Sequence, residues 1–205
     1  MISFPKLPNT ELFESVTTFR LVKIKAEPFF GDKDKLLTIE WIEGKTDRSD
    51  ISREIVKETF TRSTDGWRRF NDDKRGAWYC AFSRITAAKE VGYHLKRLQD
   101  DTDEHGSEVL LRGIFANFTG NFRCAKGLPR GKGILRASPK IYQDTQKFAN
   151  KLRNEGARGI IYPSVRDRKG VCLVAFLPEI VQKARYEDCW KMSWNKKGEP
   201  NIEKI

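Results

Sequence analysis

Residues 76–99 read GAWYCAFSRITAAKEVGYHLKRLQ and contain the change from strand to helix that decides the fold. The compact, aromatic segment 76–82 is typical of a buried strand, and Ser83 follows it at a natural helix N-cap position. Apolar residues then recur at intervals of three and four, which predicts one amphipathic helix over residues 84–99. Glu90 lies just off the apolar stripe of this helix.

The residues before this unit also show regular patterns. Segments 17–26 and 36–42 alternate apolar with polar or charged side chains, which predicts two strands with one buried face each. The sequence then becomes strongly polar, and a short helix is expected to begin after Asp47 or Ser49. The first half of the chain is therefore expected to open with strands and continue into a helix.

Strands and one strong helix are also expected in the second half. Residues 108–118 predict a strand, and the Gly-rich, basic stretch 120–133 is typical of a mobile loop. A serine followed by a proline starts a helix over 138–156, which a glycine ends. Two apolar segments, 159–164 and 171–177, are predicted to be strands that pair as a hairpin.

These elements lack a regular β-α-β alternation, so they favour an α+β fold with mixed or antiparallel sheets and flanking helices. With 205 residues and 39% hydrophobic content, one domain with one substantial core is expected over residues 1–205. The residues after Ile180 are polar and are expected to form a tail, with Trp190 and Trp194 as packing anchors.

The chain is strongly basic, with a formal net charge of +11 at pH 7. This charge permits binding to nucleic acid, to anionic metabolites or to an acidic protein. Lysines and arginines are spread along the chain rather than gathered in one stripe, and no nucleic-acid motif is present, so direct nucleic-acid binding is not favoured. A basic nucleic-acid binder that stacks bases on Trp67, Trp78 and Phe122 remains the alternative from another class.

Cysteine usage and hydropathy indicate the expected compartment. The four cysteines are widely separated and form no CxxC pair, so reduced thiols are expected and a metal site is not. No apolar run is as long as a membrane span, and the N-terminus lacks the pattern of a secretory signal. A cytoplasmic location without membrane association is therefore expected.

Three polar candidates lie in neighbouring segments: Arg69 in a turn, Tyr79 on the predicted strand and Glu90 on the predicted helix. An arginine can hold a diphosphate, an aromatic ring can cover a flat group, and a carboxylate can stabilise a developing oxocarbenium ion. Each residue also has an ordinary interpretation, as a solvated arginine, a core tyrosine or a helical glutamate that faces water. The residue types alone leave both interpretations open.

Several motifs resemble the RES domain, a family named for Arg, Glu and Ser residues. Its first half is similar to Gly66–Asn71 (GWRRFN), Trp78-Tyr79 and the AAKEV segment at 87–91, and its closing segment is similar to Gly156–Arg166 (GARGIIYPSVR) together with the YQDTQ segment that begins at Tyr142. The resemblance covers about residues 17–180 in the right order, which leaves 181–205 as a polar C-terminal tail. Trp67-Arg68 replaces two usual glycines, Phe70 replaces a tryptophan, and the insertion at 98–133 is long.

The resemblance implies a fold related to the ADP-ribosyltransferases and diphtheria toxin. It implies a toxin that degrades NAD+ by phosphorolysis, with inorganic phosphate as co-substrate, or by hydrolysis, and without a metal. Mono-ADP-ribosyl transfer to a protein target is the alternative within the same fold. The implied partner is an Xre-type helix-turn-helix antitoxin that blocks the active site, or an immunity protein.

The resemblance also assigns site residues. Arg69, Tyr79, Glu90 and Ser164 match the family's catalytic residues, and Arg20 resembles the arginine on its opening strand. We expect Arg20, Arg69, Tyr79 and Ser164 to bind NAD+. Arg69 would hold the diphosphate and Tyr79 would stack against the nicotinamide end. Glu90 would stabilise the ribose cation, and Ser164 would orient ribose or nicotinamide.

Overall fold

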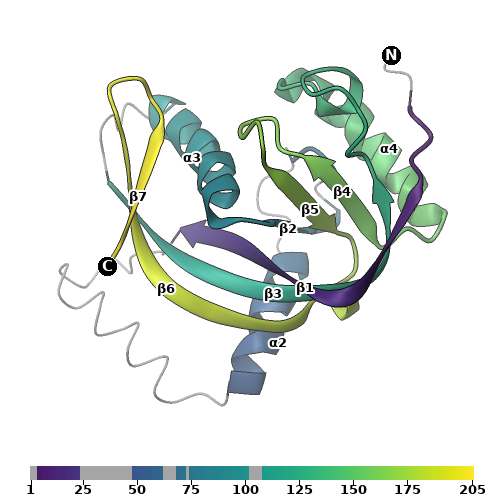
Figure 1. Ribbon diagram of the computed structural model, residues 1–205, viewed down its shortest axis with the longest axis horizontal. Helices are drawn as coiled ribbons and strands as arrows, with labels where there is room; N and C mark the ends of the chain where they lie inside the picture. Colours follow the sequence, from purple (N-terminus) through teal and green to yellow (C-terminus); the bar gives the residue numbers. More distant parts are fainter. Residues whose placement is uncertain (1–3, 24–47, 62–67, 73, 102–107) are drawn as a thin grey trace.

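The computed structural model describes residues 4–23, 48–61, 68–72, 74–101 and 108–205 (Figure 1). Its helices are α2 (Arg48–Thr61), α3 (Arg84–Asp101) and α4 (Tyr142–Asn154), with short 3-10 turns at Gly133–Leu135, Pro139–Ile141 and Pro178–Ile180. Its strands are β1 (Asn9–Lys23), β2 (Trp78–Ala81), β3 (Val109–Cys124), β4 (Gly159–Pro163), β5 (Val171–Ala175), β6 (Gln182–Trp194) and β7 (Pro200–Lys204).

The strands form one sheet in the order β1-β2-β5-β4-β3-β6-β7, and β1 also pairs with β3. These pairings join β1, β2, β5, β4 and β3 into a closed ring, to which β6 and β7 are attached through β3. The β3–β4 pair is parallel and the other pairs are antiparallel. In Figure 1, the long curved strands β1, β3 and β6 have α3 on one side and α2 on the other. The predicted α+β fold, with a mixed sheet and flanking helices, is therefore confirmed.

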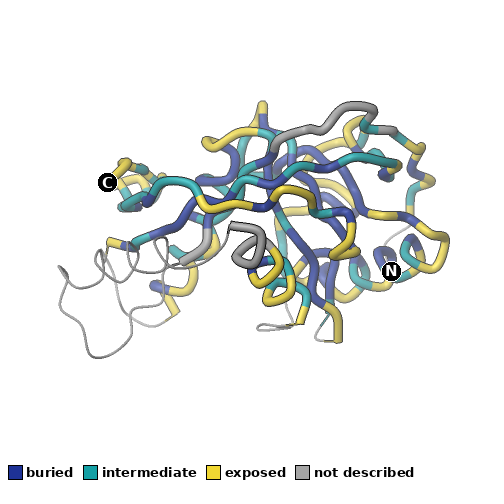
Figure 2. Tube along the Cα trace, turned by 90° about the horizontal axis from the view of Figure 1, so that it is seen from below, coloured by how far each residue is buried: buried dark blue, intermediate teal, exposed yellow. Residues whose placement is uncertain are grey.

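The core lies on both faces of the paired strands. Ala81 and Cys172 oppose each other in the β2–β5 register and belong to one buried cluster, which α3 and α4 cover. Cys80 and Leu173 form the next pair and belong to the second cluster, beside α2. Figure 2 shows buried residues running along the crossing strands. Because side chains alternate along each strand, one short pair of strands contributes to both clusters.

The strongest patterns in the sequence predicted their elements well. The helix expected over 84–99 is α3, and the helix expected over 138–156 is a 3-10 turn followed by α4. The two predicted strands 159–164 and 171–177 are β4 and β5, which pair as an antiparallel hairpin. The predicted strand 36–42 and the end of 17–26 lie outside the described residues, and β1 begins earlier, at Asn9.

The prediction of a loop over 120–133 is wrong in its first part, because β3 continues to Cys124. Gly120, with φ of 109°, pairs with Leu12 of β1, and this backbone conformation favours glycine. The glycine therefore allows β3 to bend and continue rather than end.

The polar segment after Ile180 is not a tail outside the sheet. It forms β6 and β7, and β6 pairs with β3 from Gln182 to Met192. Trp190 and Trp194 pack against the core, as expected. Only three of the thirteen residues of β6 are buried, at intervals of five and three, so its strand pattern is weak in the sequence. Among the described residues, no helix is both long and apolar enough to cross a membrane.

Candidate active site

A cavity of about 360 Å³ lies among α3, the strands β1 and β2, and the segment that follows β4. This volume falls within the range of small-molecule sites, roughly 300 to 1,000 Å³. The charged and titratable residues of its wall include four arginines, one carboxylate and one histidine: Arg20, Arg68, Arg69, Arg166, Glu90 and His94. The cavity therefore has a strong positive charge and a single carboxylate among its described lining residues.

Arg69 belongs to a tight turn, here called the arginine turn (residues 68–72), which is closed by a bridge between Arg68 and Asn71. The Nη1 atom of Arg69 donates hydrogen bonds to the carbonyl oxygens of Ile134, at 2.8 Å, and Arg136, at 2.9 Å. Only 8% of Arg69 is exposed. One corner of the guanidinium is thus fixed by the chain before α4, while the side chain also forms part of the cavity wall.

The hydroxyl of Tyr79 fixes the same turn from β2. It accepts a hydrogen bond from the backbone N–H of Phe70 and donates one to Asn71 Oδ1, both at 2.9 Å. Burial raises the pKa of Tyr79 to about 12, so the hydroxyl stays protonated at neutral pH. Tyr79 also lines the cavity. Because its hydroxyl already has two partners, its ring is the part that is available to a ligand.

Helix α4 holds the outer side of the arginine turn. Gln146 Nε2 donates to the carbonyl oxygen of Arg68 at 2.9 Å, and Arg153 Nη2 donates to that of Phe70 at 3.0 Å. The Arg153 guanidinium also lies over the ring of Phe176, 4.1 Å from its centroid. The turn that carries two cavity arginines is therefore held by β2 and α4 together.

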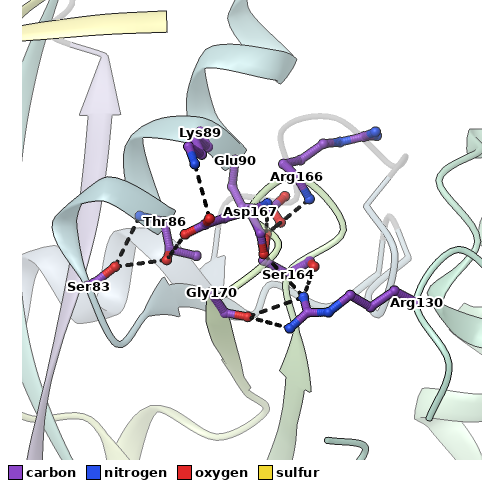
Figure 3. A network of polar contacts seen from close by, with 9 residues as sticks. All are labelled: Ser83, Thr86, Lys89, Glu90, Arg130, Ser164, Arg166, Asp167 and Gly170. Atoms are coloured by element: carbon purple, nitrogen blue, oxygen red, sulfur yellow. Dashed lines mark hydrogen bonds and ion pairs between the residues drawn. The ribbon is translucent and has the colours of Figure 1, made fainter. Parts of the chain in front are cut away.

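The carboxylate of the cavity is held by a buried serine (Figure 3). Ser164 Oγ donates a hydrogen bond of 2.5 Å to Glu90 Oε1 and accepts hydrogen bonds from the backbone N–H groups of Arg166 and Asp167, at 3.1 and 2.9 Å. Ser164 is completely buried. It therefore reaches the cavity through Glu90 rather than by contributing to the wall itself.

The segment that presents this serine, here called the serine turn (residues 164–170), is anchored to α3 through Asp167. Thr86 Oγ1 donates to Asp167 Oδ2 at 2.7 Å, and Lys89 Nζ lies 3.0 Å from Asp167 Oδ1. Burial by itself would raise the pKa of Asp167. The hydrogen bonds from Thr86 and Lys89 outweigh this effect and hold the pKa below its ordinary value. Arg130 donates to the carbonyl oxygens of Ser164, Asp167 and Gly170 from the opposite side (Figure 3).

Arg20 of β1 belongs to the lining residues of the cavity and has a buried guanidinium. Its guanidinium lies over the ring of Trp78, 4.8 Å from the centroid, and its Nη1 atom is buried without a hydrogen-bond partner among the described residues. Burial, and then the nearby charge of Arg68, lower the pKa of Arg20 to about 10. A buried donor without a partner is costly, so Arg20 is a candidate for pairing with an anion.

The structure thus brings Arg20, Arg69, Tyr79 and Glu90 to one cavity and places Ser164 directly behind Glu90. Sequence reasoning did not find the contribution of three further lining residues: Arg68, His94 and Arg166. His94 had a usable signal, because a residue four positions after Glu90 lies on the same face of a helix. Arg166 gave no such signal, because only the tertiary fold places it beside α3.

All four cysteines are free thiols, as expected. Within the described ranges, no group of three or more His, Cys, Asp or Glu side chains is placed to hold a metal ion.

The chain is similar to one family model and to solved structures. The model of the RES domain family matches residues 49–195, which is more than half of the chain. The crystal structure of the M. tuberculosis MbcT-MbcA toxin-antitoxin complex contains a chain with 12% sequence identity and a TM-score of 0.49, over 89% of this chain and 87% of that chain. No curated protein matches the chain.

Proposed function

This chain belongs to the RES domain family, and we propose that it binds NAD+ in the cavity and breaks the bond between nicotinamide and ribose. The observation that carries this proposal is the position of Glu90. It is the one carboxylate among the described residues of the wall, it lies among arginines, and Ser164 holds its Oε1 atom. A dinucleotide with an anionic diphosphate and a cationic pyridinium needs this combination of charges.

The arginines would bind the diphosphate of NAD+. Arg20 would offer its Nη1 atom, which has no hydrogen-bond partner among the described residues, and Arg69 would offer the part of its guanidinium that does not bind the Ile134 and Arg136 carbonyls. Charge-assisted hydrogen bonds from a planar guanidinium suit phosphate oxygens better than a single lysine ammonium does. The ring of Tyr79 would cover the nicotinamide end.

Glu90 would act where positive charge develops. When the bond between the anomeric carbon and the nicotinamide nitrogen breaks, its electron pair leaves with neutral nicotinamide and the ribose becomes an oxocarbenium ion. A carboxylate fixed beside that carbon stabilises the ion, and a well-placed group of this kind is worth about 3 kcal/mol. An oxygen of inorganic phosphate, or of water with loss of a proton, then forms the new bond to the anomeric carbon.

We assign Ser164 a positioning role in this scheme. The notion that it orients ribose or nicotinamide requires a free hydroxyl at the wall, but Ser164 is fully buried and its Oγ has three partners. Its contribution to catalysis would therefore act through Glu90. The serine turn and its anchor at Asp167 would keep the carboxylate in one orientation.

We further propose that the protein is a toxin, because loss of NAD+ arrests growth, and that a partner controls it by closing the cavity. Membership of the RES domain family supports an Xre-type helix-turn-helix antitoxin, with an immunity protein as the alternative. We also propose that residues 1–205 form one RES-type domain, since β6 and β7 belong to the same sheet as the strands of the cavity.

The proposal is tested with purified protein and NAD+. Nicotinamide release is measured by chromatography, and phosphorus NMR identifies the second product. ADP-ribose-1″-phosphate indicates phosphorolysis, free ADP-ribose indicates hydrolysis, and ADP-ribose attached to protein indicates transfer. Intact NAD+ after long incubation with folded protein would contradict the proposed reaction.

Glu90→Gln is the decisive variant, because it keeps the shape of the side chain and removes its charge. Turnover should fall by about 100-fold or more while NAD+ still binds, since the lost interaction belongs to the transition state. Glu179→Gln, at an exposed position outside the cavity, is the matched control and should keep full activity. Near-normal nicotinamide release by folded Glu90→Gln protein would contradict the mechanism.

A further inference from the structure

His94 is a cavity residue that the proposed reaction does not use. It lies four residues after Glu90 on α3, and both line the cavity. Residues at this spacing are neighbours on a helix surface, with roughly 5 to 6 Å between their Cβ atoms. His94 keeps part of its surface open to solvent while the protein around it desolvates the imidazole.

Positive charges face His94 from three parts of the fold. Arg68 and Arg69 come from the arginine turn, Arg166 comes from the serine turn, and Arg97 comes from α3 itself. Desolvation, followed by the charges of these four residues, lowers the pKa of His94 to about 4. The imidazole is therefore neutral at pH 7, although it lies among groups that bind anions.

The neighbours of His94 on α3 complete its surroundings. The ring of Tyr93 lies 5.5 Å from that of His94, and the guanidinium of Arg166 lies 3.3 Å from the centroid of Tyr93. The Nε atom of Arg166 is buried without a hydrogen-bond partner among the described residues. Glu90, one turn earlier, is the one carboxylate of the cavity wall in the described chain. The cations beside His94 thus exceed the local negative charge.

An anion in the cavity changes the field at His94. A unit negative charge about 6 Å from the ring, at an effective dielectric constant of about 20, raises a histidine pKa by about two units. A diphosphate carries two such charges and also neutralises the arginines that now repel the proton. The shift on binding therefore moves the histidine toward the protonated form, in which both ring nitrogens are donors.

We infer that His94 is a proton-linked anion-binding residue: it is neutral in the free protein, and it takes up a proton at mildly acidic pH when a diphosphate is bound in the cavity. In that state the imidazolium joins the arginines in holding the phosphate oxygens. The identity of the diphosphate as that of NAD+ rests on the proposed function, whereas the proton uptake rests on the arrangement of charges around α3.

The chain is well suited to a direct test, because it contains only two histidines. His105→Gln leaves His94 as the single imidazole, and NMR then follows its ring signals against pH with and without ADP-ribose. ADP-ribose is the chosen probe because its diphosphate is esterified on both sides and keeps its charge across this pH range. The midpoint should lie near 4 in the free protein and rise by at least one unit at saturation.

Binding must show the same linkage. If the midpoint rises by about two units, ADP-ribose affinity should increase about fourfold between pH 7.5 and pH 5.5, because a proton is bound with the ligand. His94→Gln should remove this increase, while His105→Gln should retain it. Titration calorimetry in two buffers with different ionisation enthalpies measures the proton uptake independently.

A midpoint that does not move at saturating ADP-ribose would overturn the inference, and so would a lack of ADP-ribose binding to folded protein. The NAD+ cleavage assay is judged separately. If NAD+ is cleaved but the midpoint of His94 does not shift, the inference is wrong and the proposed reaction stands. If the midpoint shifts but NAD+ is not cleaved, the proposed reaction is wrong and the inference stands.

Discussion

Ser164 and Glu90 lie 74 positions apart in the sequence and are joined by a 2.5 Å hydrogen bond from the serine hydroxyl to the carboxylate. The serine comes from the turn after β4 and the glutamate from the middle of α3. Asp167, in the same turn as the serine, binds Thr86, one turn before Glu90 on α3, and Lys89, the residue directly before Glu90. The position of the cavity's carboxylate therefore depends on how this turn packs against α3.

Ser164→Ala should lower both stability and turnover. The substitution removes the donor to Glu90 and leaves the N–H groups of Arg166 and Asp167 without an acceptor, which costs about 1 to 3 kcal/mol of unfolding free energy. Urea denaturation and nicotinamide release measure the two effects. Ser138→Ala, which removes one acceptor from the backbone N–H of Lys140 outside the cavity, should change stability slightly and leave turnover intact. An equal loss of turnover in both variants would contradict the positioning role.

Tyr79→Phe should weaken NAD+ binding more than it slows chemistry. The ring is retained, but the Phe70 N–H and Asn71 Oδ1 lose their shared partner, so the arginine turn becomes less well ordered. The expected loss of stability is about 1 to 3 kcal/mol, together with an increase in KM of about tenfold. Tyr186→Phe, at a partly exposed position on β6, is the control. An unchanged KM would show that the Tyr79 hydroxyl does not organise the turn.

Arg20→Met should separate stability from binding. Burial, followed by the charge of Arg68, lowers the pKa of Arg20 to about 10, and its Nη1 atom is buried without a partner in the described part of the chain. The folded protein therefore bears the cost of a poorly compensated charge. Thermal stability should stay the same or rise, while NAD+ affinity falls by about tenfold or more. Arg185→Met on β6 is the control outside the cavity. A large loss of stability with unchanged affinity would identify Arg20 as a structural residue.

Stability should fall as the pH is lowered from about 6.5 toward 4, partly because of His94. The unfolded chain binds a proton at its ordinary pKa of 6.5, whereas the folded protein does so only near pH 4. Protons therefore favour the unfolded state across this window, and the contribution that is present above pH 6.5 is lost as the pH falls. Thermal melts of His94→Gln should show a shallower decline than those of the parent. Parallel curves would show that His94 titrates normally in the folded state.

The sequence predicted the elements whose periodicity is set by one buried face. Helices α3 and α4, and the hairpin of β4 and β5, all have strong apolar patterns and clear end signals. Strand β6 lacks such an apolar pattern, because its buried residues are only Ala184, Cys189 and Met192. The last residues of β3 were predicted to be a loop for another reason, since a glycine such as Gly120 within a strand resembles a loop signal.

The residues of the candidate site could be predicted when they lie close together in the sequence and match a family motif. Arg69, Tyr79 and Glu90 come from one turn, strand and helix in succession, so their meeting follows from local order. The role of Ser164 was less accessible, because its complete burial behind Glu90 depends on contacts of the serine turn with α3 and Arg130. Arg166 reaches the cavity for the same tertiary reason.

The closed ring of strands also determines when the cavity can form during synthesis of the chain. Thr18 of β1 donates a hydrogen bond to the carbonyl of Ala116, 98 residues later, and the cavity wall extends from Phe19 to Cys172. A nascent chain therefore has no complete cavity until β5 has left the ribosome. Translation products that end before β5 lack part of the wall, so the proposed cleavage of NAD+ would require a chain that extends through β5.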